Sequence, residues 1–205
     1  MLRPYKTPHD TWASGRETLR GWKRIVLPLA MHPAGCDLIS EMFRTNPEPR
    51  DLIPELDALG VAATSSEELM NGIVALLHKN LLKYNWVGFY MVQKEVSGGD
   101  VLILGPFQGS MTPHTRIQLN QGICGAAASS GKTVVVDDVN ADSRYLACSL
   151  ETKSEIVVPV FVTGKVVGEL DIDSHLPAAF AAEDLKLCEH AAKLLGKWME
   201  THPGG

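Results

Sequence analysis

The sequence predicts an α+β fold in which flanking helices cover one face of an antiparallel sheet. An amphipathic helical pattern stands at residues 65–83 and again at residues 182–200. Between them, runs of β-branched and aromatic residues come in pairs joined by short turns, which connect antiparallel neighbours. We therefore expect one folded domain over residues 63–205, preceded by an N-terminal arm over residues 1–62.

The arm differs in composition from the rest of the chain. It holds seven prolines and no sustained alternation of apolar and polar residues. Short helices are expected in it at residues 36–44 and 51–59. The sequence gives no role to this segment.

Both long helices carry a start signal. Ser65 followed by Glu68 fits a capping box, in which the two residues bond each other's backbone amides. Apolar residues then recur at helical spacing, at Leu69, Ile73, Leu76, Leu77 and Leu81. In the last helix, Glu183 and Asp184 occupy the first turn, where the helix dipole favours negative charge. Both patterns predict helices with one apolar face.

The middle of the chain alternates short strands with short helices. The expected strands are residues 85–93, 101–107, 115–119, 133–136, 154–162 and 166–173. The expected short helices are residues 122–130, which end before a glycine, and residues 141–147.

The last two strands form a hairpin around Thr163-Gly164-Lys165, and its register decides which side chains share a face. A two-residue turn with regular pairing places Glu155 opposite Ile172. A three-residue loop or an equivalent bulge pairs Glu155 with Asp173 instead. We expect the second arrangement, which gathers Glu155 with Asp171 and Asp173 on one face.

Composition excludes several classes of partner. Of the 205 residues, 45% are apolar and 21% are charged, which is the balance of a globular protein with a sizeable core. The net charge of −5 does not indicate a nucleic-acid partner. No apolar run approaches the roughly 18 residues that span a membrane. We therefore expect no membrane partner and a cytoplasmic location.

The chain holds four cysteines, Cys36, Cys124, Cys148 and Cys188. No pair has CxxC spacing, which argues against a structural zinc site. Structural disulfides are not expected in a cytosolic chain. Each cysteine is therefore either buried or chemically reactive, and we expect Cys36 and Cys188 to be structural.

Six short motifs follow one another along the chain: Asn85-Trp86-Val87-Gly88-Phe89-Tyr90, Leu104-Gly105-Pro106-Phe107-Gln108-Gly109, Gln121-Gly122-Ile123-Cys124-Gly125, Ala147-Cys148, Ser154-Glu155-Ile156-Val157-Val158-Pro159 and Leu170-Asp171-Ile172-Asp173-Ser174. In their order and spacing they resemble the free methionine-(R)-sulfoxide reductases. The resemblance covers about residues 63–200. It implies a GAF-like antiparallel sheet with flanking helices and a pocket for free, not peptide-bound, methionine sulfoxide.

The resemblance also implies roles for single residues. It implies that Cys148 is the nucleophile and that Cys124 belongs to the redox set. The substrate-binding residues that it implies are Trp86, Tyr90, Glu155, Asp171 and Asp173. One position departs from the family, because His114 stands where another redox cysteine is usual. The route by which the enzyme is recycled is therefore open.

Sulfoxide reduction needs an attacking thiolate, an acid that protonates the departing oxygen, and a thiol that resolves the sulfenic acid. Cys148, at the predicted end of the helix at residues 141–147, precedes a polar loop and is expected to be accessible; an inert buried cysteine is the alternative. Cys124 lies at a predicted helix start, which lowers a thiol pKa. It is the internal candidate to resolve Cys148, with an external thiol as the alternative. His114 is either a proton carrier or a surface residue.

The three acids either form a solvated sheet face or bind a cation. Carboxylates on one face repel each other, and the α-ammonium group of an amino acid would relieve that repulsion. Without it, at least one pKa should rise, and a partly protonated carboxyl is a candidate acid for the sulfoxide oxygen. No histidine pattern accompanies the acids, so we expect no metal and no cofactor.

Trp86, Gly88 and Tyr90 share one face of their predicted strand. Most aromatic stripes of this kind belong to a core. Alternatively, Gly88 leaves room between the two rings for an apolar slot that suits the methylthio end of a substrate, while Trp and Tyr still offer hydrogen-bond donors.

The expected function is the reduction of free L-methionine (R)-S-oxide to L-methionine by a cysteine thiolate, with disulfide or external-thiol recycling and a thioredoxin-type reductant. The alternative is a GAF small-molecule-binding or sensor module without efficient turnover, which the replacement at His114 favours. A metal-dependent hydrolase ranks third, because no nucleophile motif such as GxSxG is present. GAF domains often pair through helices, so we expect a homodimer by analogy.

Overall fold

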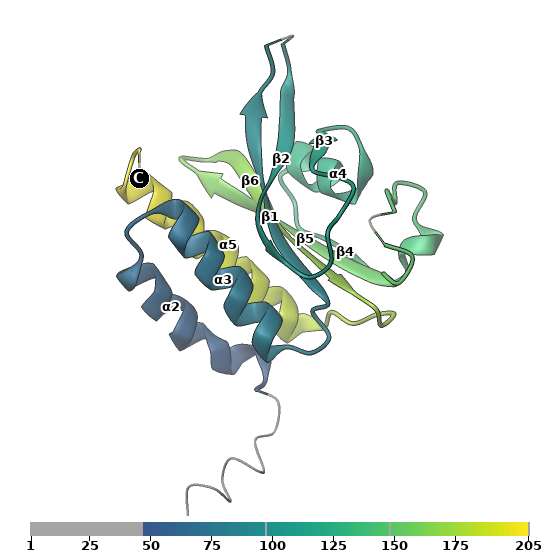
Figure 1. The fold of residues 1–205 in the computed structure, drawn as a ribbon, viewed down its shortest axis with the longest axis horizontal. Helices are drawn as coiled ribbons and strands as arrows, with labels where there is room; N and C mark the ends of the chain where they lie inside the picture. Colours follow the sequence, from purple (N-terminus) through teal and green to yellow (C-terminus); the bar gives the residue numbers. More distant parts are fainter. Residues whose placement is uncertain (1–46, 97, 148, 205) are drawn as a thin grey trace, which may run out of the picture. The chain divides into compact units, whose positions relative to one another are not determined.

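Six strands form one antiparallel sheet in the computed structural model, which describes residues 47–96, 98–147 and 149–204 (Figure 1). The strand order is β3-β2-β1-β6-β5-β4. The strands are β1 Trp86–Lys94, β2 Asp100–Gln108, β3 Arg116–Gln118, β4 Val134–Val136, β5 Ser154–Val162 and β6 Lys165–Ser174. Every neighbouring pair is antiparallel, so the predicted fold class is confirmed.

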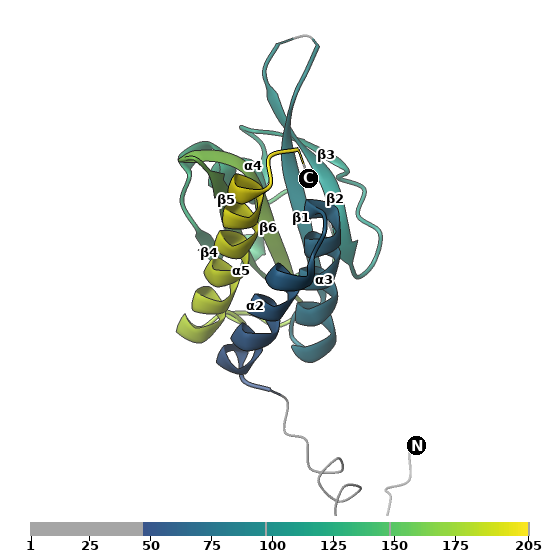
Figure 2. The same ribbon diagram turned by 90° about the vertical axis from the view of Figure 1, so that its left-hand side faces the viewer.

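Two helices, α3 Ser66–Asn80 and α5 Ala182–Thr201, cover one face of the sheet, and α2 Ile53–Ala62 packs on these two helices (Figure 2). A short 3-10 helix, η2 Pro49–Leu52, leads into α2. Leu52 and Leu56 are buried in the same core as α3 and α5, so the helix expected at residues 51–59 packs with the domain that follows it. The helix expected at residues 36–44 lies outside the described residues.

Helix α3 begins where the sequence predicts. Ser65 is its N-cap, and the Ser65 side chain accepts a hydrogen bond from the Glu68 backbone N–H at 3.1 Å. The Glu68 carboxylate accepts from the backbone N–H and the hydroxyl of Thr64, at 2.8 and 2.7 Å. The first bond of the predicted capping box is therefore present, whereas Glu68 bonds Thr64, one residue before the N-cap, and not the backbone N–H of Ser65.

The helices pack on alternate residues of the strands. The buried strand residues on this face are Val87, Phe89, Ile156, Val158, Val160, Leu170 and Ile172. Burial of each large apolar side chain contributes about 1.5–3 kcal/mol, which makes this the main core of the domain. Within the described residues, no helix is both long and apolar enough to cross a membrane.

The opposite face of the sheet carries α4, Gly122–Ser130, and the loops on either side of it. Ile123 and Ala127 of α4 pack with Leu102 and Val157 in a second, smaller apolar cluster. The helix ends as predicted, because Gly131 adopts the left-handed conformation with φ of 61°.

The β5–β6 hairpin adopts the register that gathers the acids. The chain turns through Thr163 and Gly164, whose φ angles of 48° and 78° suit a tight two-residue turn. A bulge next to Val160 then shifts the pairing by one residue and brings Glu155 opposite Asp173. The predicted bulged register is confirmed.

The helix predicted at residues 141–147 is wrong. A short 3-10 helix, η3 Val139–Ala141, ends there, and turn and irregular backbone follow. The Asp142 carboxylate accepts from the Arg144 backbone N–H at 2.9 Å, a local bond that competes with helix formation. The expectation that a helix ends at Cys148 therefore loses its basis.

Candidate active site

Four carboxylates project from the sheet face that is opposite to α2, α3 and α5. Strand alternation brings Glu169, Asp171 and Asp173 of β6 to this face, and Glu155 of β5 pairs with Asp173. The β1 partners of the three β6 acids are Trp86 for Asp173, Gly88 for Asp171 and Tyr90 for Glu169. The predicted acids and aromatic residues therefore lie side by side on three neighbouring strands.

All four acids are buried, with exposed fractions of 4% for Glu155, 0% for Glu169, 2% for Asp171 and 5% for Asp173. None of the ion pairs between described residues includes any of them. In the same part of the chain, both Glu169 oxygens and Asp171 Oδ1 have no hydrogen-bond partner. An unpaired carboxylate is costly away from water. The cluster must therefore hold protons or bind a cation.

Burial raises the pKa of every member of the cluster. The pKa of Asp171 rises to about 7. Burial, and then the negative charge on Asp171, raises the pKa values of Glu155, Glu169 and Asp173 well above their ordinary range. Burial therefore favours the protonated form of each acid, and the rise in pKa that was expected of at least one of them is found.

Cys124 faces the cluster from α4. Its buried thiol donates toward Asp171 Oδ2 at 3.5 Å and toward Glu155 Oε1 at 3.7 Å. Cys124 is the third residue of the helix, as predicted. A thiol that donates to carboxylates keeps its proton, which opposes the thiolate that the helix start was expected to favour.

The Trp86 ring fills the space that Gly88 leaves. A Cβ added to Gly88 would lie 2.3 Å from Cη2 of Trp86, so the indole lies across the glycine. The indole also stacks on Phe107, with ring centroids 5.7 Å apart, and lies 6.2 Å from the Tyr90 ring. The slot predicted over Gly88 is therefore wrong. Without a side chain, Gly88 admits the indole ring, and the ring itself borders the cleft.

Both aromatic residues hold the loop that follows β2. Trp86 Nε1–H donates to the Ser110 carbonyl at 3.0 Å, and the Tyr90 hydroxyl donates to the His114 carbonyl at 2.7 Å. The polar atoms that the sequence offered as donors to a substrate therefore bond this loop. Their rings remain part of the cleft wall.

A small cleft of about 120 Å³ opens beside this face. Four predicted substrate-binding residues line it: Trp86, Tyr90, Asp171 and Asp173. The other lining residues are Asn85, Ser110, Met111, Thr112, Ser149, Glu151, Thr152 and His175. Glu155, Glu169 and Cys124 are not part of this lining. The cleft is smaller than the 300 Å³ or more typical of drug-sized ligands, and suits a small metabolite.

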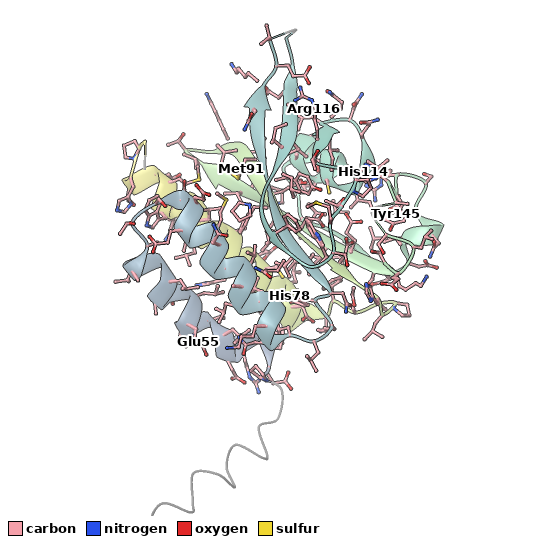
Figure 3. All side chains as sticks on the ribbon, viewed as in Figure 1. Glu55, His78, Met91, His114, Arg116 and Tyr145 are labelled. Atoms are coloured by element: carbon pink, nitrogen blue, oxygen red, sulfur yellow. The ribbon has the colours of Figure 1, made fainter. Side chains whose placement is uncertain are left out.

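His114 connects the loop after β2 with the segment that leads to Cys148. His114 Nε2 lies 3.0 Å from the Ala147 carbonyl oxygen. Figure 3 shows His114 and Tyr145 on the side of the sheet away from Glu55 of α2. Cys148 itself lies outside the described residues. The residues next to it in sequence contact the site, since Ala147 contacts His114 and Ser149 lines the cleft.

Sequence reasoning misses Glu169 and the loop residues of the cleft. Glu169 stands two positions before Asp171, so the period of two alone would have placed it on the same face. The loops at residues 110–112 and 149–152 carry no local signal of this kind, because their position over the sheet depends on tertiary contacts. Cys188, in contrast, is buried in the helical core as expected.

One group of described residues has the spacing of metal ligands. The Cys124 sulfur and one oxygen each of Glu155 and Asp171 lie within 4.8 Å of one another. These atoms already face each other in thiol–carboxylate contacts, and no histidine belongs to the group. We assign no metal to them, and the absence of a metal requirement stays a prediction.

The chain is similar to known proteins over most of this domain. Residues 65–197 match the GAF domain family. The free methionine-R-sulfoxide reductase of Escherichia coli is 36% identical over 134 residues, 65% of this chain and 78% of that protein. The Saccharomyces cerevisiae protein of the same name is 46% identical over 114 residues, 55% of this chain and 62% of that protein.

Solved structures lead to the same family. The free methionine-R-sulfoxide reductase of Neisseria meningitidis in complex with its substrate aligns with a TM-score of 0.69 and 38% identity, over 74% of this chain and 88% of that chain. The substrate complex of the Staphylococcus aureus protein aligns with a TM-score of 0.68 and 35% identity, over 75% and 97%. With its GAF domain and these matches, the chain belongs to the free methionine-R-sulfoxide reductase family.

Proposed function

We propose that this protein reduces free L-methionine (R)-S-oxide to L-methionine. The observation that carries the proposal is a small cleft with an indole ring in its wall and two buried carboxylates beside it. The ring belongs to Trp86 and the carboxylates to Asp171 and Asp173. A free amino acid with an apolar side chain offers groups that match both parts.

The acids explain a preference for the free amino acid. An α-ammonium group at Asp171 and Asp173 supplies the positive charge that the described residues do not supply. A methionine sulfoxide inside a peptide has no such group. The Trp86 ring offers an apolar surface to the methylthio end, and sulfur contacts with aromatic rings are favourable.

Cys148 is the proposed nucleophile. Its thiolate attacks the sulfoxide sulfur, and Asp171, with a pKa of about 7, gives a proton to the sulfoxide oxygen. The sulfur–oxygen bond breaks and the oxygen passes to Cys148, which becomes a sulfenic acid while methionine is released. Cys148 is thereby oxidised by two electrons and the substrate is reduced by two.

A second thiol must then resolve the sulfenic acid. It condenses with Cys148 to a disulfide and water, and a dithiol reductant returns two electrons and two protons. Cys124 is the internal candidate because it lies against the acid cluster. An external thiol is the other route, since His114 replaces the usual cysteine. We propose a thioredoxin-type reductant, a cytoplasmic setting and a homodimer for this cycle.

The test uses both sulfoxide epimers of free methionine, with dithiothreitol or with thioredoxin and its reductase. We expect loss of the R epimer alone, and no loss with the Cys148→Ser variant. A Cys188→Ser variant is the matched control, because Cys188 lies in the core on the other face of the sheet. No turnover of the R epimer, or turnover that survives Cys148→Ser, would falsify the reductase.

The second candidate is a GAF small-molecule-binding or sensor module without efficient turnover. The replacement of the usual cysteine by His114 favours it. Calorimetry with L-methionine and with its sulfoxide separates the two candidates, because a sensor binds the sulfoxide without converting it. Product analysis of the same samples shows whether conversion occurred.

A further inference from the structure

Glu169 is a buried acid that the proposed reaction does not use. It lies two residues before Asp171 on the same face of β6, with Tyr90 and Pro159 as its register partners. Its side chain is fully buried and does not line the cleft. Glu169 therefore stands one step along the strand from the acids that face the substrate.

No cation in the described part of the chain forms an ion pair with Glu169. Neither of its oxygens has a hydrogen-bond partner there, and none of the ion pairs includes it. A buried carboxylate in this position is much less stable than the neutral acid. Burial, followed by the charge on Asp171, accordingly raises the pKa of Glu169 well above its ordinary value. Burial without a charged partner therefore favours the protonated form of Glu169.

The groups that face Glu169 from the surrounding elements are neutral or acidic. They are Tyr90 on β1, Pro159 and Glu155 on β5, Asp171 on β6 and Cys124 on α4. A cation among them would favour the ionised acid, and none of them is one. Burial and the charge on Asp171 favour the protonated form of Glu169, and the Cys124 thiol opposes them only in part.

Cys124 links Glu169 to the cleft. Its thiol donates toward Asp171 Oδ2 at 3.5 Å. The same thiol acts against the rise in the pKa of Glu169, which stands two residues from Asp171 on the same face of β6. A thiol both donates and accepts a proton. Glu169, Cys124 and Asp171 thus form a connected line of proton-carrying groups.

A proton held behind the cleft has a use in the proposed reaction. The ammonium group of a bound substrate favours the ionised form of Asp171. The same Asp171 must be protonated to serve the sulfoxide oxygen. A second acid that lies away from the ammonium group can keep its proton and pass it to Asp171 when the reaction needs it.

We propose that Glu169 is the proton reserve of this site, a positioning residue that acts on the substrate only through Cys124 and Asp171. The inference rests on the proposed reductase function. After Asp171 gives its proton to the sulfoxide oxygen, the O–H bond of Glu169 breaks and its proton passes to Cys124 Sγ. The S–H proton of Cys124 passes to Asp171, and water later restores the proton of Glu169.

The main test is the pH dependence of turnover in the Glu169→Gln variant, which keeps the shape of the side chain without an acidic proton. We expect kcat to fall about tenfold, less than the hundredfold or more of a direct acid, and KM to change less than twofold. The alkaline fall of kcat should begin at a lower pH than in the unmodified protein. Glu183→Gln, on the surface of α5, is the matched control and should change neither value.

A merely structural role would move the unfolding temperature and leave the pH profile in place. Glu169→Leu fills the same space with an apolar group, so it should unfold at or above the temperature of the unmodified protein. Its pH profile should nevertheless shift as in Glu169→Gln. An unshifted profile in a folded variant of either kind overturns the proton reserve.

Infrared spectroscopy of the complex with L-methionine, which cannot be reduced further, gives a readout besides turnover. We expect bands of protonated carboxyl groups at neutral pH, and the loss of one of them in Glu169→Gln. A spectrum whose protonated-carboxyl bands are the same in both proteins overturns the inference. An unmodified protein without reductase activity refutes the proposed function, whereas activity with an unshifted Glu169→Gln profile refutes the reserve alone.

Discussion

The two faces of the sheet are built from the same strands, but they bury opposite kinds of side chain. On β6, Leu170 and Ile172 enter the core with the helices, whereas Asp171 and Asp173 face the cleft. All four residues are almost fully buried, so burial alone does not separate a core from a site. The neighbouring groups distinguish the core from the site. Leu170 and Ile172 contact apolar side chains, whereas Asp171 and Asp173 have no ion pair within the described residues.

This difference explains what each face does. The helical face needs no further partner once the chain has folded, because its apolar side chains are buried in the core that they form with the helices. The acid face is still short of positive charge after folding. A cationic ligand stabilises the folded protein by supplying that charge, and the gain grows with ligand concentration.

The largest loss of stability is expected when an acid is placed on the face of the sheet that packs on the helices. In Leu170→Asp, a carboxylate is buried among apolar side chains, and we expect the free energy of unfolding to fall by about 4 kcal/mol or more. Urea unfolding measures it. Asp171→Leu, one residue along the strand, is the matched control and should be as stable as the unmodified protein or more so. Equal losses in both variants would show that the faces do not differ.

Loss of a charge from the cleft should weaken binding more than folding. We expect Asp173→Asn to lower kcat/KM by about a hundredfold, because truncation of a buried charge pair costs about 2–5 kcal/mol. Steady-state kinetics measures this loss, and calorimetry with L-methionine should show a similar one. Asp100→Asn, at the exposed start of β2, is the control. A hundredfold loss in kcat/KM with unchanged affinity would place Asp173 in the chemical step instead of in binding.

The stability of the ligand-free protein should fall as the pH rises through the window set by Asp171. Burial raises the pKa of this acid from 3.8 to about 7, so the folded state holds a proton that the unfolded state releases. Between those two values the contribution of Asp171 to stability is lost, by up to a few kcal/mol. Thermal unfolding between pH 4 and pH 8 should show a smaller fall in Asp171→Asn. A steeper fall in that variant would contradict the assignment.

The alternation of apolar and polar residues along the strands predicted much of this architecture. Alternation in residues 170–173 placed Asp171 and Asp173 on one face, because a strand leaves its side chains no other choice. The register was harder, since a single extra residue reverses the face of Glu155. The turn residues Thr163 and Gly164 and the bulge beside them satisfy both the turn and the apolar pattern of β5.

Features that depend on tertiary contacts were not predictable. The sequence cannot show that the Trp86 ring lies across Gly88, because side-chain orientation follows from packing against Phe107. It also predicted a helix where the Asp142 side chain bonds the backbone instead. The loops over the cleft are held by hydrogen bonds between distant residues, and no local pattern encodes those.

The position of the indole ring can be tested at Gly88. In Gly88→Ala, the new methyl group occupies the place of Cη2 of Trp86, so the ring must move. We expect a loss of about 2 kcal/mol in the free energy of unfolding and a raised KM. Gly164→Ala is the control for a glycine without such contacts, and its cost should come from backbone strain at φ of 78° alone. Unchanged KM in Gly88→Ala would show that the ring does not form the substrate surface.

The smallest change in stability is expected for a substitution at His114. The same substitution is the most direct test of how the enzyme is recycled. His114→Cys removes one hydrogen bond to the Ala147 carbonyl, worth about 1 kcal/mol. Because the imidazole reaches the residue next to Cys148 in the sequence, we expect the new cysteine to form a disulfide with Cys148 after reaction with the sulfoxide. Mass spectrometry of the unreduced protein measures it, with His114→Ala as the control.

A disulfide at that position should also speed recycling by thioredoxin, since an internal thiol traps the sulfenic acid before an external one arrives. A cross-link between Cys124 and Cys148 in the unmodified protein would show that the acid face already holds the resolving thiol. In that case His114→Cys would leave the rate unchanged. If neither cross-link forms and turnover depends on the concentration of external thiol, the cluster around Cys124 serves substrate binding and proton supply alone. The face of the sheet that carries the four acids would then take no part in the electron transfer.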